Sequence, residues 1–181
     1  MKAVCRYGAL GAFHPRVFPR RGLSSVVASR TFEGLFEMSW PDGWTLQEVK
    51  ECTFRLHPPG GGGRLLEVWY SPMPGVLQQD EMDEWVNREV VKFKRERGLE
   101  SYLGGVWSAA GPCAVLQGLT NEDGRTEWHV QMFLAIPRVL LTGEYHHPVG
   151  YAAAAMANIG AVKGEIEEAI RVFFSTAATK Q

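Results

Sequence analysis

The sequence predicts an α+β fold in which helices flank an antiparallel β-sheet. Three observations predict it: a long helical pattern lies in the middle of the chain, three strand patterns follow it in succession, and a second helical pattern comes last. Successive strands joined by short turns pair antiparallel. With 45% hydrophobic and 11% aromatic residues, 181 residues can build one packed domain. We expect this single domain over residues 32–177, after a basic N-terminal extension over residues 1–31 and before a tail over residues 178–181.

Strand patterns also come before the long helix. Residues 32–40 read as an edge strand that ends at Pro41, residues 53–57 as a strand closed by two prolines, and residues 64–72 as a strand rich in β-forming side chains. The glycine run at residues 60–63 lacks the Lys-Ser or Lys-Thr of a phosphate-binding loop and precedes a strand, not a helix. We therefore interpret it as a hairpin loop.

The clearest helix extends from Asp80 to Arg97. Apolar side chains recur there at spacings of three and four residues, which places them on one face that we expect to pack on the core. Asp80 is the expected N-cap and Gly98 the expected C-terminal cap. The apolar stripe consists of Met82, Trp85, Val86, Val90 and Phe93.

Residues 103–120, 125–136 and 138–147 read as three successive strands. Asp123-Gly124 predicts a hairpin turn between the first two, because glycine accepts a positive φ. Alternate residues of the middle strand face opposite sides of the sheet, and we expect one side buried and the other largely in water. The buried side is expected to carry Trp128, Val130, Met132 and Leu134, and the wet side Glu127, His129, Gln131 and Phe133.

The end of the chain has two parts. Residues 149–161 are rich in alanine but bounded by proline and glycine, so we expect a short helical or mobile insertion. Residues 161–177 read as the C-terminal helix. Its apolar stripe includes Val162, Ile166, Ala169, Ile170 and Phe173.

Charge divides the chain. Residues 1–32 hold six basic residues and no acidic one, whereas the remainder holds 13 basic against 20 acidic residues, a net charge of about −7. An arginine-rich, serine-containing, acid-free N-terminus has the composition of a mitochondrial transit peptide, so we expect import to the matrix side. The alternatives to a transit peptide are a disordered basic tail or a start site assigned too far upstream. The alternative localisation is the bacterial cytoplasm.

Composition also excludes several classes of function. The acidic body argues against nucleic-acid binding, since phosphate contacts need a concentrated cationic surface. No apolar run is long enough to span a membrane, which predicts a soluble product. Three cysteines, an odd number without CxxC spacing, favour neither a disulfide framework nor a zinc site.

No catalytic signature occurs in the chain, so we expect no catalytic residue, no cofactor and no metal. His146 and His147 are adjacent, and adjacent residues of a strand face opposite sides of the sheet. These two imidazoles would therefore not converge on one metal ion.

The polar face of the middle strand is the strongest candidate site. His129 shares this face with Glu127 and Gln131 and can meet Gln117 or Glu144 on neighbouring strands. We interpret the face as a solvated or partner-binding surface. The alternative is the polar cluster of a small hydrolase or ligand-binding enzyme, built on Glu127, His129 and Glu144.

Trp40 and Trp44 lie on either side of a Pro-Asp-Gly turn. They either hold the first turn of the domain against the core or form an aperture that a partner covers, because two exposed indoles would otherwise be a liability. We favour the core and keep both as candidates for partner contact. The candidate partner-binding residues are Trp40, Trp44, Gln117, Glu127, His129 and Gln131.

Three stretches of the chain resemble one protein family. These are FEMSWPDGW (residues 36–44), LLEVWYSP (residues 65–72), and the run from GPCAVLQG (residues 111–118) to GRTEWHVQMFLAIPRVLLTGEY (residues 124–145). They are similar to the opening, the second strand and the central strands of the PsbP-like α/β/α sandwich family. That family includes photosystem extrinsic proteins, Ran-binding Mog proteins and Eag-type secretion chaperones. The matched positions are Trp40, Pro41, Gly43, Trp44, Gly111, Ala114, Trp128 and Gln131.

The resemblance implies an α/β/α sandwich that binds other molecules and has no active site. Together with the basic leader, it predicts a non-catalytic, protein-binding accessory or assembly subunit of a larger complex, in the mitochondrion. Two alternatives remain open. One is a bacterial type VI secretion chaperone that binds hydrophobic effector helices, and the other is the small enzyme described above.

Overall fold

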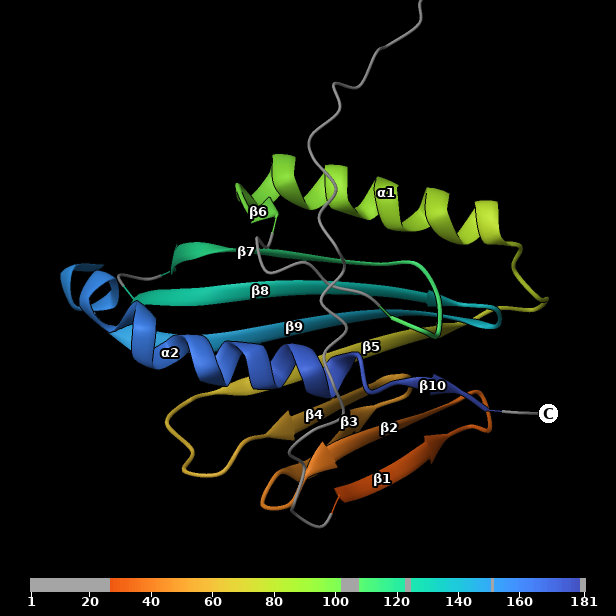
Figure 1. Ribbon diagram of the computed structural model, residues 1–181, viewed down its shortest axis with the longest axis horizontal. Coiled ribbons are helices and arrows are strands. Elements are labelled where there is room, and N and C mark those ends of the chain that lie inside the picture. Colours follow the sequence, from red (N-terminus) through yellow and green to blue (C-terminus); the bar gives the residue numbers. More distant parts are fainter. Residues whose placement is uncertain (1–26, 102–107, 123–124, 151, 180–181) are drawn as a thin grey trace, which may run out of the picture.

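The computed structural model describes residues 27–101, 108–122, 125–150 and 152–179. Its large antiparallel sheet has the strand order β3-β4-β5-β9-β8-β7-β6, and helices α1 and α2 lie on its two faces (Figure 1). The predicted α+β class, an antiparallel sheet flanked by helices, is confirmed. The large sheet and the helices comprise β3 (Thr45–Lys50), β4 (Thr53–His57), β5 (Leu65–Pro72), α1 (Gln79–Arg97), β6 (Glu100–Ser101), β7 (Cys113–Glu122), β8 (Arg125–Ile136), β9 (Val139–Gly150) and α2 (Ala152–Phe173).

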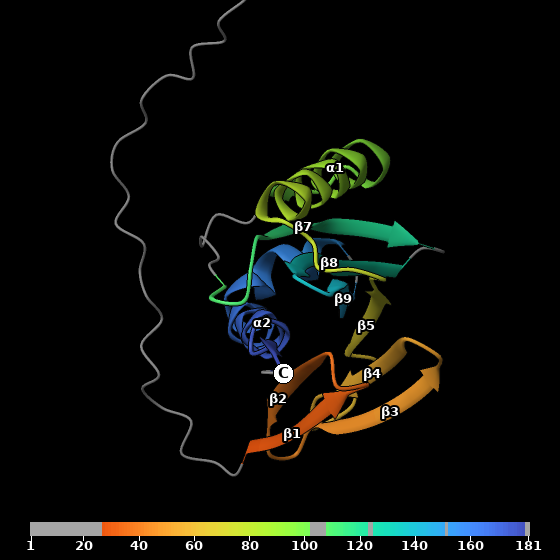
Figure 2. The same ribbon diagram turned by 90° about the vertical axis from the view of Figure 1, so that its right-hand side faces the viewer.

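A small second sheet completes the fold. It has the order β1-β2-β10, formed by β1 (Val27–Phe32), β2 (Phe36–Pro41) and β10 (Ala177–Ala178). It lies on the same side of the large sheet as α2, so that α2 and the β1–β2 hairpin together close one face (Figure 2). The hydroxyl of Ser175, just after α2, donates to the backbone oxygen of Ser39 in β2 over 2.6 Å, which ties the two elements together.

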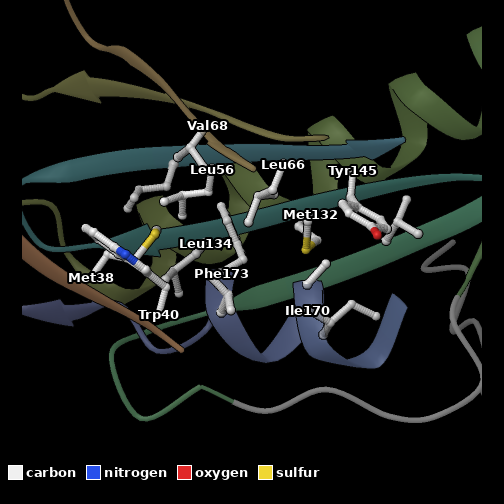
Figure 3. Packing of buried hydrophobic residues seen from close by; sticks show 14 of the residues in the cluster. Met38, Trp40, Leu56, Leu66, Val68, Met132, Leu134, Tyr145, Ile170 and Phe173 are labelled. Atoms are coloured by element: carbon white, nitrogen blue, oxygen red, sulfur yellow. The ribbon is translucent and has the colours of Figure 1, made fainter. Parts of the chain in front are cut away.

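The main core lies between the large sheet, α2 and the β1–β2 hairpin (Figure 3). Alternate residues of the central strands point into it, as the period of two in a strand dictates. Trp128 packs against this core and Val130 and Met132 are fully buried in it, so this side of β8 is confirmed as apolar and covered. Large side chains that fill the core are Phe36, Met38, Leu66, Met132, Leu134, Tyr145 and Phe173.

A second, smaller core lies under α1. It joins the helix to β7 and β8 on the opposite face of the sheet, where Met82 and Val86 meet Leu116 and Phe133. The predicted stripe of α1 is confirmed, and Gly98 caps the helix with φ 64° and an N–H that donates to the oxygen of Lys94. The N-terminus differs from the prediction: the helix begins one residue before Asp80, and the N–H of Gln78 donates to the carboxylate of Glu81 over 2.7 Å.

The folded part begins earlier and ends later than predicted. β1 begins at Val27, inside the predicted extension, and pairs with β2 across a turn at Glu33 and Gly34, both with positive φ. Residues 32–40 are therefore the end of one strand and most of the next. In the predicted tail, Ala178 pairs with β2 and the hydroxyl of Thr179 donates to the backbone oxygen of Gly34. Residues 1–26 lie outside the described residues.

Residues 149–161 are not an insertion. β9 continues to Gly150 and α2 begins at Ala152, so most of the segment is the first half of one long helix. Its alanines have the highest helix propensity, which outweighs the glycines at residues 160 and 164. The predicted stripe of the second half is confirmed, with Ile166, Ala169 and Phe173 buried. No helix in the described ranges is long and apolar enough to cross a membrane.

Other strand boundaries follow the prediction in part. The strands predicted over residues 53–57 and 64–72 are β4 and β5, but β3 was not predicted. The strand predicted over residues 103–120 begins only at Cys113, and residues 102–107 lie outside the described residues. Asp123-Gly124 also lies outside them, although its flanking residues Glu122 and Arg125 are register partners.

Candidate functional site

Four polar side chains gather where β8 and β9 pair, on the face that carries α1. His129 and His146 are direct register partners, and Gln131 is the partner of Glu144 one step along the strands. The turn at Pro137 and Arg138 fixes this register, because only two residues separate β8 from β9. Side chains that face each other across an antiparallel pair lie close enough to interact. We call the group of Glu127, His129, Glu144 and His146 the His–Glu cluster.

One carboxylate oxygen is the centre of the His–Glu cluster. Oε1 of Glu144 lies 2.8 Å from Nε2 of His129 and 3.3 Å from Nε2 of His146. Nη1 of Arg97, in the last turn of α1, lies 3.4 Å from the same oxygen. On its other side, the ring of His146 places Nδ1 3.1 Å from Oε2 of Glu127. The helix therefore brings a cation to a site that two strands build.

The electrostatics of the cluster favour a charged Glu144. Burial alone raises the pKa of this carboxyl, but the imidazoles of His129 and His146 beside it hold that pKa well below its usual range. The pKa of His146 is raised, first by its hydrogen bond to Glu144, against the opposing effect of burial, and further by Glu127. Opposite charges are thus arranged to stabilise each other in the interior.

His129 is the most deeply buried member, with 1% of its surface exposed. Its Nε2 is close to Oε1 of Glu144 but lacks the alignment of a hydrogen bond, and it has no other partner among the described residues. A substrate could reach this ring only if the covering elements moved apart. The geometry therefore favours a fixed role, in packing or ion binding, over general acid–base catalysis.

An open face continues from the His–Glu cluster towards β4. α1 packs mainly on β7 and β8, and no described element lies over the corresponding face of β4 and β5 (Figure 2). Arg55 and Glu67 are register partners there, joined by an ion pair of 2.8 Å, and half-buried Trp69 is two residues further along. We call Arg55, Glu67, Trp69 and Thr142 the open face.

The tryptophans of the first turn belong to the core. Trp40 and Trp44 are both only 6% exposed and pack in the main core, where Figure 3 shows Trp40 beside Met38. This burial favours the first of the two predicted roles, packing of the first turn on the core, over contact with a partner. Their apolar rings contribute more as core packing than as an exposed surface.

Gln117, Glu127, His129 and Gln131 do not form one surface. Glu127, His129 and Gln131 share a face as predicted, and the predicted contact of His129 with Glu144 is confirmed. Gln117 is the register partner of Val130 and so lies on the other face of the sheet.

The expectation of a wet face is wrong at its centre. Gln131 is 1% exposed, and Phe133 is fully buried beneath α1. The amide nitrogen of Gln131 donates to the oxygen of Gly143 over 3.0 Å. The reason is tertiary: α1 docks on this part of the sheet, which the pattern of one strand cannot show.

The two adjacent histidines separate as predicted. His147 points to the α2 side, where its Nε2 lies 2.7 Å from Oε2 of Glu165. Nevertheless, His146 meets His129 across the strand pair and, with Glu144, completes a group of three potential ligand residues that the sequence pattern did not predict. The two-residue turn after β8 was the signal that could have found it, since it sets which residues are opposite. Residues of the site that sequence reasoning missed are Arg55, Glu67, Trp69, Arg97 and His146.

Comparison with known proteins identifies the fold but no family. No family model matches the chain, and no curated protein does. A protein from Bacteroides thetaiotaomicron is 16% identical with a TM-score of 0.56, and the match covers 84% of this chain and 48% of that one. This chain thus spans about half the length of that protein. LpqN of Mycobacterium tuberculosis, described as involved in cell envelope biogenesis, is 12% identical with a TM-score of 0.51 over 88% of each chain.

The solved structures with similar folds also include cyanobacterial PsbP from Synechocystis. It is 14% identical, with a TM-score of 0.44 over 94% of this chain and 99% of that one. A PsbP is therefore among the proteins that the chain is similar to, as the sequence resemblance predicted. All of these likenesses concern the fold alone.

Proposed function

We propose that this chain is a non-catalytic, protein-binding domain that docks onto a larger complex as an accessory or assembly subunit. The observation that carries the proposal is the open face. It combines a half-buried aromatic side chain, Trp69, with the ion pair of Arg55 and Glu67, and no described element covers it. Aromatic and arginine side chains are the residues most enriched at the energetic centres of protein interfaces.

The partner is a protein with a basic docking surface. The chain from residue 33 onwards has a net charge of about −7, and complementary charge steers association and selects the partner. The strongest measurable consequence is salt dependence, because charges at the rim of an interface are screened over about 8–10 Å at physiological ionic strength. Raising the salt concentration should therefore slow association.

A photo-crosslinking residue at position 69 tests the docking surface. Incorporated into the full chain in its native cells, it should yield one dominant protein adduct, whose identity reciprocal tagging then confirms. The matched control is the same residue at Val91, which is 65% exposed on the far side of α1. Trp69→Ala should lower the affinity for that partner about tenfold or more. Equal adducts from both positions, or a monomer without adducts, would contradict the proposal.

The proposal also includes a location: the chain is imported into mitochondria. The six basic and no acidic residues in the first 32 positions support it. A C-terminal fluorescent fusion of the full chain should enter mitochondria, and the same fusion lacking residues 1–26 should stay in the cytosol. Removal of only those residues leaves β1 intact. A cytosolic full-length fusion would overturn the targeting, without affecting the docking surface.

A further inference from the structure

Two imidazole nitrogens and one carboxylate oxygen converge inside the His–Glu cluster. His129, Glu144 and His146 each offer one ligand atom, and these atoms all lie within 4.8 Å of one another. Imidazole and carboxylate are ligands of zinc and its neighbours, with bonds of about 2.0–2.2 Å that place ligand atoms roughly 3–3.5 Å apart. We propose that these three residues bind one divalent transition-metal ion of the zinc type.

The orientation of His146 supports this assignment. Its Nδ1 faces the carboxylate of Glu127 at 3.1 Å, and an ionised carboxylate only accepts hydrogen bonds. Nδ1 therefore carries a ring proton, and in the neutral ring the lone pair lies on Nε2. Nε2 is 3.3 Å from Oε1 of Glu144, so either a proton or a metal ion can lie between the two atoms. Histidines that bind metal ions commonly donate their other ring N–H to a carboxylate in this way, which fixes the orientation of the ring.

The buried ring of His129 is the second, independent observation. The side chain is 99% removed from solvent, yet its Nε2 has no hydrogen bond, although it lies 2.8 Å from the same carboxylate oxygen. A buried polar atom without a partner is costly, and folded proteins avoid it. A metal ion bound between His129 and Glu144 would satisfy this nitrogen.

Two side chains of the His–Glu cluster are accessible to solvent, so an ion can reach the cluster from outside. The side chains of Glu127 and His146 are 30% and 29% exposed, on the side of the open face. Arg97, which shares Oε1 of Glu144, is 42% exposed on the last turn of α1. Three protein ligands leave a fourth position of a tetrahedral ion for water.

Zinc binding by the untagged full chain tests the proposal. After treatment with a chelator, competition of the protein with a chromophoric chelator for Zn²⁺ should show one ion per chain, and Co²⁺ should give the visible absorption of a four- or five-coordinate site. His146→Ala should weaken Zn²⁺ binding at least about tenfold. Glu127→Gln should weaken it by about 10–100-fold, although Glu127 does not contact the ion, because it orients His146.

The matched control is His147→Ala, which removes an adjacent histidine on the opposite face. It should leave the stoichiometry and the affinity for Zn²⁺ unchanged. Circular dichroism confirms that each variant is folded, and Zn²⁺ should raise the Tm of the native protein but not of His146→Ala. Equal affinities of the native protein and His146→Ala, or no binding at equimolar Zn²⁺, would overturn the proposal. Neither result affects partner docking, which crosslinking at position 69 measures separately.

Discussion

The rings of His129 and His146 meet in a tilted arrangement across the β8–β9 pair, with their centroids 4.8 Å apart and an angle of 35° between the ring planes. Two imidazoles at this distance would repel each other if both were charged and unpaired. The carboxylate of Glu144 prevents this, because its Oε1 lies within 3.3 Å of an Nε2 atom of each ring. The anion is therefore the element that permits two histidines to share this part of the sheet.

Glu144→Ala should destabilise the protein by about 1–3 kcal/mol, the usual cost when buried polar groups lose their partner. It would remove the carboxylate that both imidazoles and the guanidinium of Arg97 lie beside. Denaturant unfolding at pH 7 in the presence of a chelator measures the change. The control is Glu48→Ala, which removes the 62% exposed carboxylate that pairs with Arg30 at the surface and should cost less than about 1 kcal/mol. If both variants lowered the free energy of unfolding by the same amount, the His–Glu cluster would contribute no more to stability than a surface ion pair.

Gly111→Ala should destabilise the protein by about 1–3 kcal/mol, as overpacking does. A Cβ atom at this position would lie 2.0 Å from the backbone oxygen of Ala135, whose N–H donates to the oxygen of Pro112. Because the obstacle is a backbone atom in the central strand, β7 would have to shift away from β8. Gly75→Ala is the matched control, since no atom lies within 4 Å of its Cβ, and it should change stability by less than about 0.5 kcal/mol. Thermal unfolding of the two variants compares them directly.

The sequence predicts the fold well where buried residues recur at regular spacing along an element. The stripe of α1 and Gly98 place that helix to within one residue, because an amphipathic face and an αL cap are local features. Prolines mark the end of β5 in the same way. By contrast, β3 lies at the edge of the large sheet and pairs only with β4. Its side chains are exposed or half-buried on both faces, so apolar and polar residues do not alternate along its sequence.

The candidate site is predictable only in part, for a related reason. The contact of His129 with Glu144 follows from alternation and strand order, which are local. The burial of Phe133 on the same face does not, because it depends on where α1 docks. Arg97 joins Glu144 over 47 positions of sequence, and no spacing rule connects the end of a helix to the fourth element after it in the chain.

Stability should fall in acid partly through Glu165. Burial raises the pKa of this carboxyl, but its hydrogen bonds from Arg64 and His147 outweigh burial and lower the pKa below the ordinary value. A carboxyl with a lowered pKa in the folded state stabilises the protein above its unfolded pKa of about 4.3. That contribution disappears as the pH falls through the folded-state pKa. The side chain is 42% exposed, so the effect is screened and modest.

The native protein should lose this contribution between about pH 5 and about pH 3. In Glu165→Gln, the fall in the free energy of unfolding over this range should therefore be shallower. Urea unfolding at several pH values measures this slope. Glu167→Gln, two positions along the same helix and facing Lys163, controls for the change of net charge. The same acid slope in Glu165→Gln and in the native protein would show that the contacts with Arg64 and His147 do not persist in solution.

Arg97→Gln should strengthen zinc binding to the His–Glu cluster about fivefold or more at low salt. The guanidinium lies 3.4 Å from Oε1 of Glu144, so it competes with a metal ion for this oxygen and repels the ion. Two unit charges about 4 Å apart near a protein surface interact by roughly 1–4 kcal/mol, which is enough for this change. Arg95→Gln removes the same charge one position from Glu96, away from the cluster, and should have little effect. Competition with the chromophoric chelator at two salt concentrations measures both variants, and the gain in Arg97→Gln should shrink as salt screens the repulsion. If Arg97→Gln instead weakened zinc binding, the guanidinium would be holding Glu144 in position for the ion, not competing with it.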